Sequence, residues 1–141
     1  MTRIGMSVKA DGPLFRKGNA ILQQGVQDAI QELVEIGEQR LDEQARPRPG
    51  GVYLSVAAAQ PGKASTGNYR RNINGFVKRM VGIITDGGVI YGPWLEGTSS
   101  RNQSTRFKGY AMFRRTRDWL QGKAKGVAEK HAKRIARKMG G

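Results

Sequence analysis

The sequence has few of the residues that most often carry out catalysis. It contains no cysteine and one histidine, His131. Without cysteine the chain has no thiolate nucleophile and no thiolate ligand for a metal. His131 falls on the apolar stripe of a predicted helix, where a packing role is expected for it more than proton transfer. We therefore predict no cofactor.

The sequence also offers few carboxylates in the arrangements that hydrolytic enzymes use. Glu96 is far in sequence from other acids except Asp86, so neither a glycosidase-like pair nor a two-metal site has clear support. Gly50-Gly51 and Gly87-Gly88 lack the Lys and Ser/Thr of a phosphate-binding loop and are expected to form turns. The prediction is that the chain is not an enzyme. A metal-dependent activity lost on changing Glu96 and Asp86 would instead indicate a hydrolase or nuclease.

Long apolar runs are also missing. No stretch approaches the roughly 20 apolar residues of a membrane span, and the segment from Met1 to Asp11 lacks the apolar core of a signal peptide. A soluble protein with no membrane partner is expected. The 141 residues suit one domain, 1–141.

Negative charge is scarce outside one segment. The chain has 25 Lys and Arg against 11 Asp and Glu, a formal net charge of +14. Between Asn19 and Ala45, however, six acids accompany a single base, Arg40. The basic remainder of the chain fits contact with nucleic acid, and the separation of charge equally fits pairing of an acidic face with a basic face on a neighbouring copy. Composition leaves both readings open.

Two long segments of the sequence have the apolar periodicity of an α-helix. An apolar stripe runs from about Asn19, taken as the N-cap, to Ala45, with acids and glutamines opposite it. A second stripe runs from about Tyr110 to Gly140, and its outer face is heavily basic. These patterns predict one long acidic helix near the N-terminus and one long basic helix near the C-terminus.

Strand patterns precede and separate these helices. Apolar residues alternate from Arg3 to Ala10, and less regularly from Tyr69 to Met80. Val81–Ile84 and Val89–Tyr91 flank Asp86-Gly87, which predicts a hairpin with its turn there. The fold class expected is α+β, a small antiparallel sheet packed against the long N-terminal helix and the basic C-terminal helix. Polar, turn-rich composition predicts mobile loops near 58–67 and 99–107.

Three blocks in the middle of the chain carry a more specific signal. They are Thr66-Gly67-Asn68-Tyr69-Arg70-Arg71-Asn72-Ile73, Tyr91-Gly92-Pro93-Trp94-Leu95-Glu96-Gly97-Thr98 and Arg106-Phe107-Lys108-Gly109-Tyr110-Ala111-Met112-Phe113. In this order they resemble the tail-component or neck protein family of long-tailed bacteriophages, whose members perform head-to-tail joining or tail completion. Two departures, Glu96 followed directly by Gly97 and Thr105-Arg106-Phe107 in place of Arg-Pro-Phe, indicate a divergent branch.

The resemblance implies a structural virion protein and not a catalyst. It implies a homo-oligomeric ring, commonly a hexamer, at the head-tail joint or tail end, in a neck, tail-completion or tail-terminator role. The expected neighbours are the portal or connector complex with its stopper, the tail tube or tail terminator, and the genomic DNA that passes through nonspecifically. Assembly is expected in the host cytoplasm.

Two sets of candidate residues follow. The subunit-interface candidates are Glu32, Glu35, Asp42, Trp94, Glu96 and Arg106, with Glu96 expected to pair with an arginine such as Arg106 of its own or a neighbouring copy. The DNA-path candidates are Arg70, Arg71, Arg101, Arg106 and Lys108. The alternative function is a nonspecific nucleic-acid-binding protein, for which the charge of +14 and the basic helix with Tyr110, Phe113 and Trp119 are the grounds.

Overall fold

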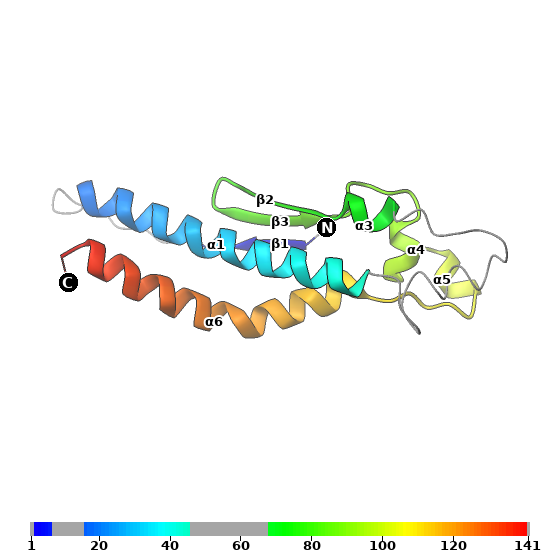
Figure 1. Ribbon diagram of the computed structural model, residues 1–141. Coiled ribbons are helices and arrows are strands. Elements are labelled where there is room, and N and C mark those ends of the chain that lie inside the picture. The colour runs from blue at the N-terminus through cyan, green and yellow to red at the C-terminus, as the bar shows by residue number, and fades with distance from the viewer. Residues whose placement is uncertain (1, 7–15, 46–67, 141) are drawn as a thin grey trace.

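A computed structural model describes residues 2–6, 16–45 and 68–140 of the chain (Figure 1). The predicted α+β fold is confirmed: a small antiparallel sheet lies with a long N-terminal helix and a long C-terminal helix. In chain order the elements are β1 (Thr2–Gly5), α1 (Arg16–Gln44), α3 (Asn68–Asn72), β2 (Asn74–Lys78), β3 (Val81–Thr85), α4 (Gly92–Glu96), α5 (Arg101–Ser104) and α6 (Met112–Lys138). None of the helices in these ranges is long and apolar enough to cross a membrane.

The two long helices lie side by side over most of their length and run antiparallel (Figure 1). At 1.5 Å per residue each is about 40 Å long. Glycines allow the close approach: a Cβ on Gly37 would lie 2.8 Å from Leu120 Cδ1, and one on Gly25 would overlap the side chain of Ile135. Helix α1 begins at Arg16, so Asn19 lies within its first turns and is not the predicted N-cap. Packing of the helix decides its start, because single-residue propensity is a weak signal.

The sheet has the order β1-β3-β2, and both pairings are antiparallel. Thr2 pairs with Ile84, and Asn74 pairs with Thr85. All three strands contact α1, and α6 also contacts β1. The strand expected over Arg3–Ala10 is observed as Thr2–Gly5, and residues 7–10 lie outside the described part.

The predicted hairpin was placed at the wrong turn. Strands β2 and β3 form the hairpin, and Arg79 and Met80 connect them with positive φ angles of 49° and 63°. Positive φ at both residues of a two-residue loop matches the right-handed twist of the strands. Asp86 accepts the backbone N–H of Gly88 in a local turn after β3, and the chain then leads into α4. Val89–Tyr91 is therefore not a strand.

One hydrophobic core joins these elements. It contains fully buried side chains from α1 and β3, together with residues from the α3 and α4 segments and the first turns of α6. The buried members are Val26, Ile30, Leu33, Val34, Leu41, Ala45, Tyr69, Ile73, Ile84, Leu95, Met112, Phe113 and Leu120. Tyr69, expected at the start of a strand, lies instead on α3, the short helix that precedes β2.

Candidate functional site

Two of the three blocks that carry the family resemblance meet at one end of the molecule. The backbone N–H of Tyr110 donates to the carbonyl of Leu95 (2.6 Å), and that of Ala111 donates to the carbonyl of Glu96 (3.2 Å). We call the paired segments 91–98 and 106–114 the clasp. Leu95 lies on α4. The clasp attaches α4 to the beginning of α6.

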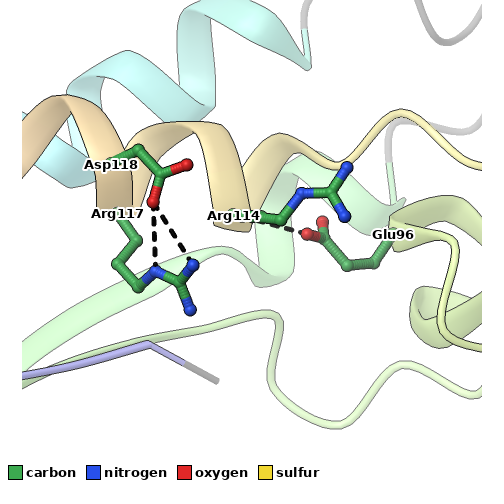
Figure 2. Close-up of polar contacts among 4 residues, drawn as sticks. All are labelled: Glu96, Arg114, Arg117 and Asp118. Atoms are coloured by element: carbon green, nitrogen blue, oxygen red, sulfur yellow. Dashed lines mark hydrogen bonds and ion pairs between the residues drawn. The ribbon is translucent and has the colours of Figure 1, made fainter.

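Glu96 caps α6 from outside that helix (Figure 2). Its two carboxylate oxygens accept the backbone N–H groups of Phe113 and Arg114, each at 3.0 Å. The first N–H groups of a helix have no partner within the helix, and the N-terminal end favours negative charge. Ala111, the residue at the N-cap position, has a φ of 52° and makes no side-chain capping bond. Glu96 therefore performs the capping, and within the chain its carboxylate binds the α6 backbone.

Glu96→Ala is expected to lower the free energy of unfolding by about 1–2 kcal/mol, since it removes both capping bonds. Glu96→Gln keeps one acceptor oxygen, so its free energy of unfolding should lie between those of Glu96→Ala and the parent. Urea titration followed by circular dichroism measures the loss. The control is Glu129→Ala, because Glu129 is an exposed acid on the same helix. Equal losses in the two alanine variants would show that the capping bonds contribute little.

The loop expected over 99–107 contains a helical turn, α5, organised by a buried asparagine. Asn102 is 4% exposed, and its side-chain N–H groups donate to the carbonyls of Trp94 (3.0 Å) and Phe107 (3.1 Å). Its side-chain oxygen accepts the N–H of Ser99 (3.0 Å). Asn102 thus ties this segment to both halves of the clasp. The other predicted loop, 58–67, lies outside the described residues.

Aromatic rings fill the space beneath α5. The Phe107 ring lies 4.6 Å from the Trp94 ring and 4.9 Å from the Tyr110 ring, measured between centroids. Offset and tilted contacts of this kind are favourable beyond the area that they bury. Trp94, predicted for the subunit interface, is half-buried within its own chain by this contact.

Three of the four acids predicted for a subunit interface bind within the chain: Glu96, as described above, Glu32 and Asp42. Glu32 accepts hydrogen bonds from Lys130 and from the buried His131, and so links α1 to α6. Asp42 accepts two hydrogen bonds from Arg70, at 2.6 and 2.9 Å. Glu35 is exposed on α1. Of these acids, Glu35 has the position that an intermolecular contact requires.

Glu32 gives the protein an acid-sensitive link between the long helices. Hydrogen bonds from Lys130 and then His131 lower the pKa of Glu32 below its ordinary value of 4.5. A carboxyl group whose pKa is lower in the folded state stabilises the protein above its unfolded-state pKa, and this contribution is lost as pH falls through the folded-state value. The parent should therefore lose stability on acidification below about pH 5.

Glu32→Gln is expected to reduce this acid-induced loss of stability. The free energy of unfolding, measured by urea titration between pH 3 and pH 7, checks it. Glu35→Gln, in the exposed part of the same helix, is the control and should follow the parent. Identical acid profiles for the parent and Glu32→Gln would contradict a role for the link.

The DNA-path candidates are distributed among several environments. Arg71, Arg101 and Arg106 are exposed on α3 and the α5 segment, which gather at one end of the molecule (Figure 1). Arg70 binds Asp42, and the ammonium group of Lys108 donates to the carbonyls of Asn102 (2.8 Å) and Gln103 (3.3 Å). Three of the five candidates are thus exposed to solvent.

A larger basic surface covers the outer side of α6. The helix carries ten basic residues against two acidic ones, a net charge of +8, and every one of the ten is exposed. They are Arg114, Arg115, Arg117, Lys123, Lys125, Lys130, Lys133, Arg134, Arg137 and Lys138. The sequence pattern already indicated this face, although none of its members was among the candidate site residues.

An open groove of about 870 Å³ borders the clasp. Its apolar lining includes Ile90, Pro93 and Phe113, and its cationic lining includes Lys108, Arg114 and Arg117. We call this feature the Ile90 groove. Ile90 is 97% exposed, the most exposed large hydrophobic residue in the described ranges. Within those ranges, no three His, Asp or Glu side chains come together as a metal site requires. Two acids, Asp86 and Glu96, also line the groove.

The chain matches no protein-family model, no curated protein sequence and no solved structure.

Proposed function

We propose that the chain is a structural protein of a long-tailed bacteriophage virion and forms a ring at the head-tail joint or the tail end. The observation that carries the proposal is the clasp. Positions within the blocks that resemble the neck and tail-component family have interlocking structural contacts there: Glu96 caps α6, and Phe107 packs between Trp94 and Tyr110. A motif built for scaffolding suits an assembly subunit better than an enzyme.

The distribution of charge supports self-assembly into a ring. Helix α1 carries the exposed acids Glu35 and Glu43, whereas α6 carries ten exposed cations, of which Lys130 binds Glu32 within the chain. Oppositely charged surfaces on one chain favour head-to-tail contacts, and such contacts close into rings when the rotation between copies allows it. In this role the partners are further copies of the chain, the connector and stopper, and the tail tube or terminator.

A complementation assay tests this function. Phage particles produced without the chain should accumulate as separate heads and tails, or as heads with tails of abnormal length, because the joining or terminating ring is missing. Adding the purified protein to such a lysate should restore complete infectious particles. Normal, infectious particles made without the chain would contradict the proposal.

Nonspecific nucleic-acid binding is the second candidate, favoured by the ten exposed cations of α6. The ring of the first proposal, which surrounds a passing genome, should bind duplex DNA weakly and without sequence preference. The logarithm of its binding constant should fall linearly with the logarithm of the salt concentration, with a slope of about −0.9 for each phosphate neutralised. Fluorescence anisotropy at several salt concentrations measures both quantities. Tight binding by a monomer that forms no ring would favour the second candidate over the first.

A further inference from the structure

The outward side of α1 contains a shallow acidic hollow. It is lined by Glu35, Glu38, Gln39, Asp42 and Ile73 and has a volume of about 390 Å³. Glu38 accepts the backbone N–H of Gly75 (3.1 Å), which places the hollow beside β2. We call this feature the acidic hollow. It combines carboxylates at its rim with an apolar side chain from the segment between α3 and β2.

The Ile90 groove has the complementary properties. Its cations include Arg114, which is exposed in the first turn of α6 (Figure 2). Ile90 stands in a loop whose preceding residues, Gly87 and Gly88, both have positive φ angles. An aliphatic side chain that is 97% exposed gains by removal from water, and Ile73 is the apolar residue of the acidic hollow that it can contact. The groove therefore presents the exposed side chain of Ile90 together with three basic residues, which outnumber its two acids, Asp86 and Glu96.

The two surfaces lie toward opposite edges of the sheet. The acidic hollow lies beside β2, at one edge of the order β1-β3-β2. The Ile90 groove is formed partly by α6, the helix that contacts β1 at the opposite edge. A contact between two different surfaces of identical chains is heterologous, and it can repeat from copy to copy.

We propose that the occupant of the acidic hollow is a second copy of this chain, which inserts Ile90 and places Arg114 against Glu35. This inference rests on the proposed function only in assigning the repeated contact to a virion ring. Ile90 supplies the apolar contact next to Ile73, and Arg114 supplies the charge that the carboxylates attract. The contact leaves Glu32 and Asp42 in their bonds within the chain.

A charge-swap experiment tests the contact. Self-association of the full chain is measured by sedimentation velocity over a range of concentrations. Arg114→Glu and Glu35→Arg should each weaken association about tenfold or more, and the chain with both substitutions should recover it, because the opposite charges face each other again. Arg115→Glu, an adjacent exposed position on α6, is the matched control. Circular dichroism melts establish that every variant is folded.

Engineered cysteines provide a second test, since the chain contains none of its own. A chain with Ile90→Cys and Gln39→Cys should form, on mild oxidation, a ladder of linked copies in steps of one chain. A chain with Ile90→Cys and Gln121→Cys, the second position being exposed on α6, should form no such ladder. A ladder confined to linked pairs would point to a two-fold dimer and overturn the repeating contact.

Further outcomes of these experiments distinguish failure of the proposed contact from failure of the proposed virion role. A parent that remains monomeric at all concentrations up to the millimolar range overturns the contact. Failure of the charge swap and of the linkage, with head-tail joining still dependent on the chain, overturns the contact and leaves the virion role standing. Successful linkage by a chain that phage particles do not need overturns the virion role and leaves the contact standing.

Discussion

Replacing Gly109 with alanine should lower the free energy of unfolding by at least about 3 kcal/mol. Gly109 has a φ of 91°, a conformation that residues with a side chain rarely adopt. A Cβ at this position would lie 2.3 Å from both the N and the Cα of Gly97. These are backbone atoms, so no side chain can move aside, and the two segments of the clasp would have to separate.

Gly122→Ala is the matched control for that variant. Gly122 lies in the interior of α6, and a Cβ there would meet no other atom within 4 Å. Alanine should therefore raise the free energy of unfolding by about 0.5–1 kcal/mol, because glycine weakens a helix interior. Urea titration of both variants measures the difference. Comparable small changes in the two would show that the close approach of Gly97 and Gly109 is not a constraint on the fold.

Asn102→Ala should cost about 2–4 kcal/mol, because it leaves buried backbone groups without partners. The side chain satisfies the carbonyls of Trp94 and Phe107 and the N–H of Ser99, and it is 4% exposed. Asn102→Asp should be equally damaging, since a carboxylate has no N–H to donate to the two carbonyls. The loss should be accompanied by a change in near-ultraviolet circular dichroism, which reports the packing of Trp94 and Phe107.

Gln103→Ala supplies the comparison for this second prediction. Gln103 is the next residue of α5 and is exposed, so its truncation should change stability by no more than about 0.5 kcal/mol. If Asn102→Ala were as mild as Gln103→Ala, the α5 segment would be held by its aromatic contacts alone. The stability of alanine variants of Trp94 and Phe107 would then be measured in the same way.

The long helices could be predicted from the sequence because their signal is periodic over many residues. The stripe through Ile30, Val34 and Leu41 faces the core, as a 3.6-residue repeat requires. The hairpin could not be placed, because Asp86-Gly87 is a stronger local turn signal than Arg79-Met80. The structure uses Arg79 and Met80 in positive-φ conformations that neither residue type favours. Pairing of whole strands decides this turn, and that information is not local.

The candidate site was predicted in part. Trp94 and Glu96 were singled out, but their partners were not, because Glu96 binds backbone groups 17 and 18 residues away. Asn102 was missed, since an asparagine in a polar segment resembles an exposed residue until the chain folds around it. The link from Glu32 to His131 spans 99 residues. Sequence spacing carries no information on a contact of that range.

We propose that this chain forms a ring at the head-tail joint or tail end of a phage particle. Cryo-electron microscopy of assembled particles, with the chain identified by a fused tag, tests it most directly. We predict a closed ring of identical copies at the neck or the tail terminus, surrounding the DNA path, with density that fits the antiparallel pair α1 and α6. Particles that lack the tag at both positions, or that carry it only in the capsid shell or in no ordered ring, would contradict the account.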